Sequence, residues 1–211
     1  MKRAIVLGNG PSLRGFDFDS LRGEFVIACN RIHLIYPKTE WRPTVYVMTD
    51  ASGNEEAAAD CRFHVRQGYP FYITNRLVHH AFNPQERPQA PHRCWPFYNE
   101  PTLKIIENCD HEAVRKIVPL KWHLPHICCY GGSVFAGVQI AAFVYGFKEI
   151  ELLGVDGAYT IGRNNHFIDD YLPTFEYTQD YVDMKNIELA TALEIAKRGC
   201  KELGVTLVRK S

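Results

Sequence analysis

The feature that most limits the fold of this chain is a series of short apolar runs, each closed by glycine or by a polar side chain. Short, unbroken apolar runs are typical of strands that are buried on both faces of a parallel sheet. We expect such strands at residues 4–7, 25–29, 45–48, 71–74, 149–156 and 205–208.

Stretches with helix-forming composition separate these runs. They lie at residues 11–21, 53–66, 131–145 and 184–203, and residues 103–118 could hold a further helix. Strands that alternate with helices imply an α/β fold. We therefore predict a single Rossmann-like domain over residues 1–211, with a mostly parallel sheet and helices on both faces.

Two segments lack this regular pattern. Residues 79–101 hold five prolines among aromatic residues, which predicts an irregular loop. Residues 157–183 are polar, rich in tyrosine and interrupted by glycine. Because of this polar, glycine-interrupted composition, we expect a lid insertion that is mobile without ligand and closes on binding.

The charge balance and the apolar pattern exclude several classes of protein. Lys and Arg together number 24, as do Asp and Glu, so no net charge recruits nucleic acid or an anionic membrane. The longest apolar stretch, residues 134–147, is too short for a transmembrane segment, and no signal peptide precedes residue 8. The sequence predicts a cytoplasmic protein, and it allows peripheral association with the inner face of the membrane and a homo-oligomer.

The seven cysteines are odd in number and scattered along the chain. The adjacent pair Cys128 and Cys129 has no CxxC partner set. Scattered cysteines of this kind are typical of a reduced protein in which they pack as small apolar residues. We therefore expect neither a disulfide framework nor a metal site built on cysteine.

Polar residues follow four of the predicted strands. These are Asn9 within the turn at residues 8–10, Asn30, Asp50 and Asp156. In open α/β sheets, ligands bind at the carboxyl ends of the strands. The coincidence predicts a ligand site at this edge, although Asn30, Asp50 and Asp156 could each simply cap the next helix.

The first of these ends, residues 8–13, reads GNGPSL. Gly8 and Gly10 would let the backbone approach a ligand, and Ser12 lies at a predicted helix start, where free N–H groups favour phosphate. Since Leu13 stands at the third glycine position, the string is not the dinucleotide fingerprint, and no GK[ST] of a P-loop follows. A tight turn without a ligand is the alternative.

Two further positions could contribute to a site. Ser133 follows two glycines and begins a predicted helix, where it could cap the helix or help to bind phosphate. His166 lies in the predicted lid and is the best placed of nine histidines, although a loop histidine is often only a surface residue. Tyrosines in the same segment, such as Tyr159, could pack the lid onto the domain.

Three parts of this pattern resemble a known family. Residues 8–13, Cys29 with Asn30, and residues 146–156 (GFKEIELLGVD) are similar to bacterial sialyltransferases of glycosyltransferase family 42. They also resemble the related 6-hydroxymethylpterin pyrophosphokinase-like family, which includes flagellin nonulosonate transferases.

The helix start at residues 131–134 and the stretch from 156 to 166 are more similar to this second family. The likeness covers residues 1–50 and 130–208 and leaves the middle of the chain unmatched.

The sialyltransferase resemblance implies a CMP-sugar donor held by Asn9, Asn30 and the helix start at Ser133. It assigns stabilisation of the departing phosphate to a tyrosine after the acidic strand end, here Tyr159. The family's general base is a histidine just before the last long helix, but residues 180–184 read DYVDM. The base would then be His166 or Asp183, or the reaction is not sialyl transfer.

Asp50 is a second departure, because those enzymes have asparagine there. A carboxylate at this position could hold a ribose hydroxyl or a metal ion.

These observations lead to one main hypothesis and two alternatives. The main one is a glycosyltransferase that moves a nucleotide-activated sugar, most simply a CMP-linked acidic sugar, onto a glycan acceptor in surface glycan assembly, with no obligatory cofactor or metal. The first alternative is an ATP-dependent pyrophosphokinase in which Asp50 and Asp156 bind Mg²⁺. The second is a non-catalytic nucleotide-binding module, which the missing histidine favours.

Overall fold

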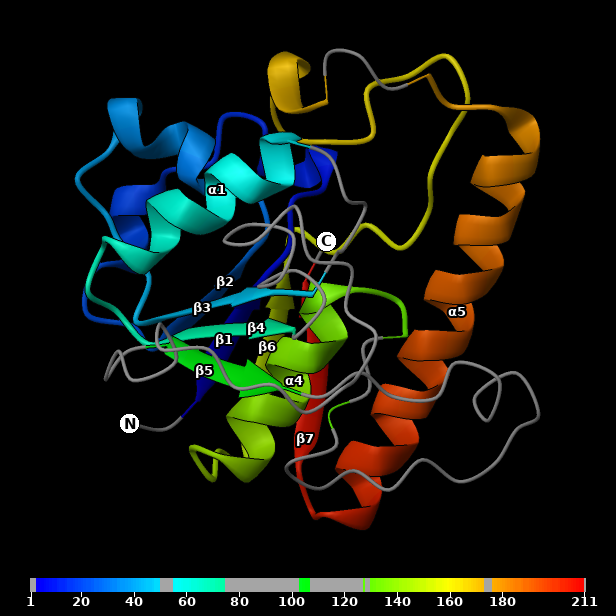
Figure 1. Ribbon diagram of the computed structural model, residues 1–211. Helices are drawn as coiled ribbons and strands as arrows, with labels where there is room; N and C mark the ends of the chain where they lie inside the picture. Colours follow the sequence, from blue (N-terminus) through cyan, green and yellow to red (C-terminus); the bar gives the residue numbers. More distant parts are fainter. Residues whose placement is uncertain are drawn as a thin grey trace, which may run out of the picture.

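The computed structural model in Figure 1 describes residues 3–49, 55–74, 103–106, 127, 130–172 and 176–210. Its strands form a sheet of seven in the order β5-β4-β3-β2-β1-β6-β7, and every neighbouring pair is parallel. The predicted Rossmann-like α/β fold is therefore confirmed. The strands are β1 (Ala4–Leu7), β2 (Val26–Cys29), β3 (Val45–Met48), β4 (Phe71–Thr74), β5 (Leu103–Ile106), β6 (Glu149–Leu153) and β7 (Thr206–Lys210).

The direction of the chain across the sheet reverses next to β1. From β1 to β5 each new strand is added on one side, and β6 then pairs with the other side of β1. Leu7 lies opposite Ala28 of β2 and opposite Leu153 of β6. The ends of β1 and β6 therefore form the topological switch point, where sheets of this kind bind ligands.

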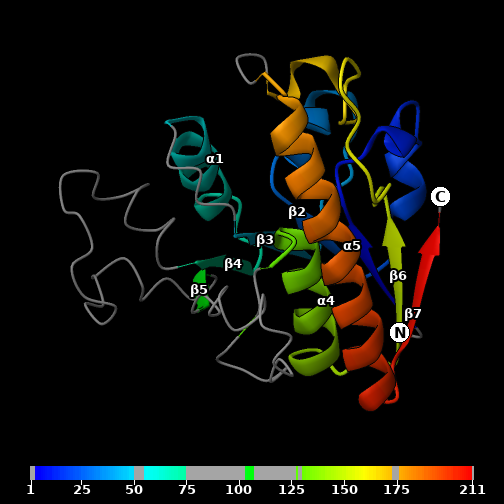
Figure 2. The same ribbon diagram turned by 90° about the vertical axis from the view of Figure 1, so that its right-hand side faces the viewer.

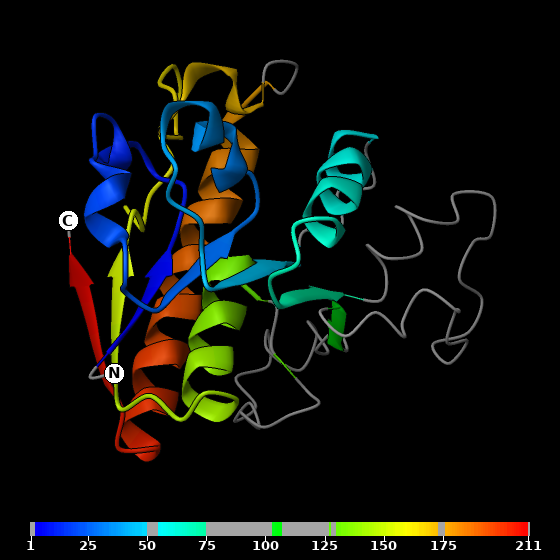
Figure 3. The same cartoon turned by 90° about the vertical axis from the view of Figure 1, so that its left-hand side faces the viewer.

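Alternate residues of β1 serve two hydrophobic cores, one on each face of the sheet. Ile5 and Leu7 belong to the core covered by the helix α1 (Glu55–Val65) and by short 3-10 helices. Ala4 and Val6 belong to the core covered by α4 (Ser133–Phe143), while α5 (Gln179–Glu202) packs beside α4. Figures 2 and 3 show α1 on one face and the α4–α5 pair on the other, as the sequence predicts.

Two expected helices differ from the structure. Residues 103–106 form the edge strand β5 instead of the start of a helix, because this segment, which ends in two β-branched isoleucines, pairs with β4 in parallel register. The helix expected at residues 11–21 is two 3-10 helices, η1 (Pro11–Leu13) and η2 (Phe18–Leu21). Gly15 separates them with a φ of +71°, a left-handed conformation that ends a helix.

Helix α5 begins five residues earlier than the predicted start at residue 184. Thr178 caps it, since the Thr178 hydroxyl accepts a hydrogen bond from the Tyr181 N–H at 3.3 Å. The last five residues of the segment predicted as a lid, 179–183, are therefore helical. We call residues 157–172, which follow the end of β6, the closing segment. It is irregular apart from one short 3-10 helix, η5 (Asp169–Tyr171).

Several expectations fall on other parts of the chain. The loop expected at residues 79–101 and residues 107–118 of the expected helix lie outside the described residues, as do Cys94, Cys109, Cys128 and Cys129. The remaining cysteines, Cys29, Cys61 and Cys200, are free and buried, in agreement with the predicted packing role.

No helix within the described ranges has the length and apolarity that crossing a membrane requires.

The close approach of β1 and β6 yields a first prediction. A Cβ on Gly8 would lie 2.4 Å from the backbone oxygen of Gly154, which cannot move without disrupting the sheet. We expect Gly8→Ala to lower the free energy of unfolding by about 3 kcal/mol, the upper part of the range for overpacking. Chemical denaturation measures this change.

Gly23→Ala is the matched control. Gly23 has a φ of +83°, and a Cβ added there would meet no atom within 4 Å, so the substitution costs only backbone strain of about 1 kcal/mol. Equal destabilisation by the two variants would contradict the steric account of the β1–β6 approach.

Candidate functional site

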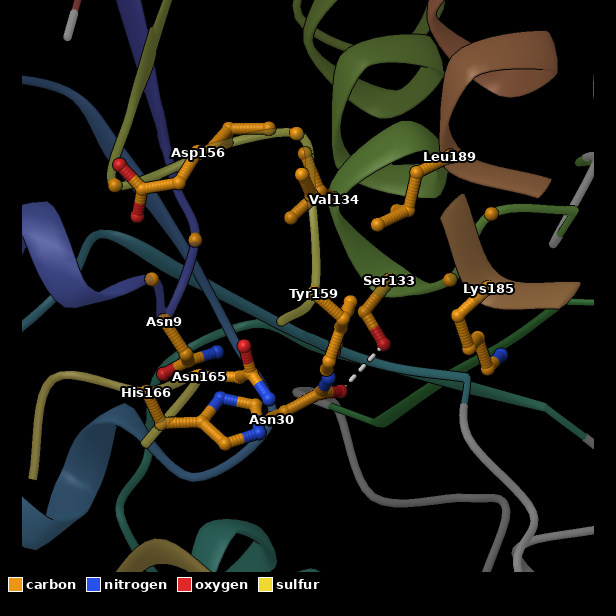
Figure 4. Close-up of a pocket in the computed structure, with 18 of the residues that line it drawn as sticks. Asn9, Asn30, Ser133, Val134, Asp156, Tyr159, Asn165, His166, Lys185 and Leu189 are labelled. Carbon is orange, nitrogen blue, oxygen red and sulfur yellow. Dashed lines mark hydrogen bonds between the residues drawn. The ribbon is translucent and has the colours of Figure 1, made fainter. Parts of the chain in front are cut away.

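A cavity of about 380 Å³ opens at the switch point. It lies beyond the carboxyl ends of β1, β2, β3 and β6, and Figure 4 shows its wall completed by the start of α4, by α5 and by the closing segment. Of the residues predicted for the site, the cavity wall includes Gly8, Asn9, Gly10, Asn30, Ser133, Asp156, Tyr159 and His166. The fold thus gathers these predicted residues, which are up to 158 positions apart (Gly8 to His166), around one space.

The turn after β1 is held by the turn after β6. The Gly8 N–H donates to the Leu153 carbonyl and the Gly10 N–H to the Gly154 carbonyl, each at 2.8 Å. The Asp156 carboxylate then accepts from the Ser12 N–H at 3.2 Å. A Cβ on Gly10 would lie 1.8 Å from this carboxylate and 2.8 Å from the Gly154 backbone oxygen, so a larger residue would disturb both turns.

This contact changes the role expected for Ser12. Its backbone N–H, predicted as a phosphate donor, is engaged by Asp156 of the protein itself. Helix η1 has only three residues, so it contributes little dipole, and Ser12 does not line the cavity. The structure therefore places the anion expected at Ser12 within the protein, as the Asp156 side chain.

Asn9 joins three segments and keeps one atom unpaired. Its Nδ2 donates to the Cys29 carbonyl at 2.9 Å, and its backbone oxygen accepts from the Phe167 N–H at 3.1 Å. Its Oδ1 is buried and accepts no hydrogen bond from the described residues. An unsatisfied buried acceptor costs about 1–3 kcal/mol, so this oxygen favours a bound donor group.

Asn30, Thr49 and Ser133 tie together the ends of β2 and β3 and the start of α4. The Ser133 hydroxyl donates to Asn30 Oδ1 at 2.5 Å and accepts from the Thr49 N–H at 2.9 Å. The hydroxyl of Ser133 is thus used within the protein. The Nδ2 group of Asn30 donates to no other described residue, and Asn30 has a φ of 51°, which turns the chain sharply after β2.

The N-terminus of α4 opens into the cavity. Its N-cap is Gly132, which has no side chain to cap the first turn, and Gly131, Gly132, Ser133 and Val134 all line the cavity wall. The backbone N–H groups and the dipole of a helix N-terminus favour a negatively charged ligand. Among the described elements that meet at the cavity, this one offers the clearest anion site.

Two residues of α5 that the sequence reasoning missed complete this side of the cavity. Lys185 Nζ lies 2.7 Å from Glu188 Oε2, and Glu188 Oε1 accepts from the Gly131 N–H at 3.2 Å. Both line the cavity together with Tyr181. Both lie within the helix predicted at residues 184–203, but no local pattern marked them as site residues, because their place in the site depends on contact with the Gly131 turn.

His166 is held on several sides inside the closing segment. Its ring stacks on Tyr171 with a centroid distance of 3.8 Å, and its Nε2 lies 2.9 Å from the Tyr177 hydroxyl. The residue is 8% exposed. Burial lowers the pKa of His166 to about 4 and the positive charge of Arg31 adds to this effect, while a hydrogen bond to the Asn9 backbone opposes it.

Tyr159 is fixed through its backbone. The Asn186 side chain of α5 accepts from the Tyr159 N–H at 2.6 Å and donates to the Tyr159 carbonyl at 3.0 Å. The Asn165 side chain binds both backbone groups of Thr160 in the same way, at 2.7 and 3.1 Å. These amide pairs anchor the closing segment beside the cavity, and mobility of the segment without ligand stays a prediction.

The remaining predicted residues lie elsewhere. Asp183 is exposed on α5, accepts from Gln179 Nε2 at 2.8 Å and does not line the cavity. Asp50 lies outside the described residues, so its proposed part in Mg²⁺ binding has no structural description. Across the part of the chain that is described, no three His, Cys, Asp or Glu side chains form a group that could hold a metal ion.

Comparison with known proteins found similarity among solved structures. No protein-family model and no curated protein matched the chain. Among solved structures, the chain is similar to the sialyltransferase CstII from Campylobacter jejuni in complex with a substrate analogue, cytidine-5'-monophosphate. The match covers 99% of this chain and 79% of that chain, with 20% sequence identity and a TM-score of 0.43. A match with a TM-score this low carries no argument about function.

The environment of His166 yields a second prediction. An NMR titration of its imidazole in the folded protein should give a pKa of about 4, compared with 6.5 for a free histidine. In the unfolded chain the His166 imidazole takes up a proton near pH 6.5, whereas in the folded protein it does so only near pH 4. The free energy of unfolding is therefore highest above pH 6.5 and decreases as the pH falls towards 4.

The variant His166→Gln should flatten part of this pH dependence in denaturation experiments. Some of it will remain, because burial also lowers the pKa of His64. A measured pKa close to 6.5 would show that His166 is not buried as described.

Proposed function

We propose that this protein is a glycosyltransferase that uses a nucleotide-activated sugar, with a CMP-linked acidic sugar as donor and a glycan as acceptor. The observation that supports this most directly is the composition of one cavity at the switch point. It combines an uncapped helix N-terminus for a phosphate with a neutral histidine and tyrosine side chains for the reacting groups.

In this proposal the donor phosphate lies at the start of α4. The first-turn N–H groups would bind its oxygens, and the Tyr159 side chain would support the same phosphate as it leaves. Asn9 and the free Nδ2 group of Asn30 lie on the neighbouring strand ends, where they would bind the sugar or the ribose. The choice of cytidine follows the sequence resemblance of residues 8–13 and 146–156 to sialyltransferases.

The preference for an acidic sugar is supported by the charges of α5. Lys185 brings an ammonium group to the cavity wall close to the α4 N-terminus, since both are linked through Glu188. A carboxylate on the sugar would gain from this cation and from the helix dipole. A neutral sugar would form no ion pair with Lys185, so this residue would add nothing to its affinity.

The reaction would break the bond between the anomeric carbon and the phosphate oxygen, and CMP would leave with the bonding electrons. The acceptor hydroxyl forms the new bond to that carbon and gives up its proton. His166 is neutral and can take this proton, although a pKa of about 4 makes it a weak base. A bound anionic donor would raise this pKa, because nearby negative charge stabilises the imidazolium ion.

Donor binding leads to a third prediction. CMP should raise the thermal unfolding temperature more than UDP, GDP or ATP, because a ligand that binds only the folded state stabilises it by mass action. Asn9→Ala should weaken CMP binding by about tenfold, the effect of one lost hydrogen bond in a buried site. Isothermal calorimetry measures the affinity directly.

Gln67→Ala is the matched control, since it removes an exposed amide on a turn remote from the cavity. It should leave CMP affinity unchanged. A response to ATP that requires Mg²⁺, without a response to CMP, would favour the pyrophosphokinase alternative. Equal CMP affinity in Asn9→Ala and the parent would remove the turn after β1 from the site.

The fourth prediction concerns the general base. His166→Ala should lower kcat by about a hundredfold with a smaller effect on donor binding, as expected for one lost base. Asp183→Asn should have little effect, because Asp183 is exposed and does not line the cavity. Transfer of sugar from the CMP donor, followed by CMP release, provides the assay.

The reverse pattern, with full activity in His166→Ala and none in Asp183→Asn, would move the base to the carboxylate. CMP binding without turnover in the parent would favour the non-catalytic alternative.

A further inference from the structure

Arg31 is a largely but not fully buried charge whose role the proposed reaction does not explain. It follows Asn30 directly after β2, at the start of the 3-10 helix η3 (Ile32–Lys38), and its side chain is 17% exposed. It does not line the cavity. Removing a guanidinium from water costs free energy unless it is paired with acceptors. The partners of Arg31 therefore indicate its role.

One set of partners lies on helix α1. Arg31 Nη1 is 3.1 Å from Glu56 Oε2, and Arg31 Nε is 3.0 Å from Asp60 Oδ2, although the alignment of this second pair is poor for a hydrogen bond. Asp60 is 9% exposed and its other oxygen lies 3.2 Å from His33 Nε2. The guanidinium is thus fixed against α1 by two carboxylates.

The other partner is Tyr171, at the end of the closing segment. Arg31 Nη1 donates to the Tyr171 carbonyl, and the Arg31 backbone N–H lies 3.4 Å from the Tyr171 hydroxyl. The Tyr171 ring is the one on which His166 stacks, at 3.8 Å and 17° between the ring planes. The contacts therefore run without a break from α1 through Arg31 and Tyr171 to the His166 ring.

We infer that Arg31 is a positioning residue that fixes the closing segment, and with it the His166 ring, against helix α1. The inference deepens the proposed function, on which it rests for the meaning of His166. Arg31 Nη1 binds both Glu56 and the Tyr171 carbonyl while Nε faces Asp60, and this planar fork of donors cannot be reproduced by a lysine ammonium, a point charge on a flexible stem.

A second arginine offers a matched comparison. Arg14 contacts the same segment from the outside: its Nη2 is 2.8 Å from Asp169 Oδ1 and 3.4 Å from the His166 carbonyl. Its side chain is 46% exposed, and its partner Asp169 is 82% exposed. Exposed pairs of this kind contribute little to stability, so Arg14 tests whether any arginine on the segment has the same effect.

The experiment is hydrogen exchange of residues 157–172 in the free protein, for the parent and four variants. The variants are Arg31→Gln, Arg31→Lys, Arg31→Gln with Asp60→Asn, and Arg14→Gln. The double variant leaves no unpaired charge at Asp60 and keeps the test valid if Arg31→Gln alone fails to fold. We expect exchange in the segment to become about tenfold faster or more in the double variant, because a charge-assisted hydrogen bond is lost.

Arg31→Lys should give an intermediate rate, and Arg14→Gln a change of less than about threefold, as for an exposed ion pair. The pKa of His166, measured by NMR, should rise in the double variant, since the ring loses both a nearby positive charge and part of its burial. If Arg31 only stabilised a region remote from His166, the pKa of His166 would stay unchanged in the double variant.

Unchanged exchange in the Arg31 variants would overturn the inference. So would faster exchange spread evenly over the sheet and the segment, or an effect of Arg14→Gln as large as that of the double variant. Neither readout needs a ligand, so a failure of CMP to bind would count against the proposed function and leave this test intact.

Discussion

Beyond their paired residues, β1 and β6 come so close together that neither Gly8 nor Gly10 has room for a side chain. A Cβ on Gly8 would meet the Gly154 carbonyl, and one on Gly10 would meet the Asp156 carboxylate. The two backbone hydrogen bonds between these turns extend the sheet past its last ladder pair. The close contact between the turns after β1 and β6 holds these two strand ends together at the switch point. The cavity lies beside these turns.

Amide side chains hold the loops around this cavity. Asn9 links the turn after β1 to β2, Asn165 folds the closing segment on itself, and Asn186 attaches the segment to α5. Each makes hydrogen bonds with backbone groups, so the loops are positioned without regular secondary structure. Among the described residues, the buried Oδ1 of Asn9 accepts no hydrogen bond and the Nδ2 of Asn30 donates none, so both can bind a ligand beside the α4 N-terminus.

Much of the fold could be predicted from the sequence because buried parallel strands are short apolar runs with distinctive ends. The runs at β1, β2, β3, β4 and β6 gave both the strand positions and the edge at which Asn9, Asn30 and Asp156 meet. Short strands with mixed composition were harder, since residues 103–106 are a strand only through pairing with β4.

The roles of site residues were less predictable, because they depend on partners far along the chain. Ser12 looked like a phosphate donor, but Asp156, 144 residues later, occupies its N–H. Lys185 and Glu188 were missed because their significance depends on contact with the Gly131 turn. His166 was predicted and lines the cavity, but its low pKa follows from burial and from Arg31, which only the folded structure brings together.

The central claim is that an anionic nucleotide binds at the switch point with its phosphate at the start of α4. A crystal structure of the protein with CMP tests this most directly. The account predicts phosphate oxygens within about 3 Å of the first-turn N–H groups of α4, with the Asp156 carboxylate still on the Ser12 N–H. A phosphate that displaces Asp156 from Ser12, or a nucleotide bound outside this cavity, would contradict it.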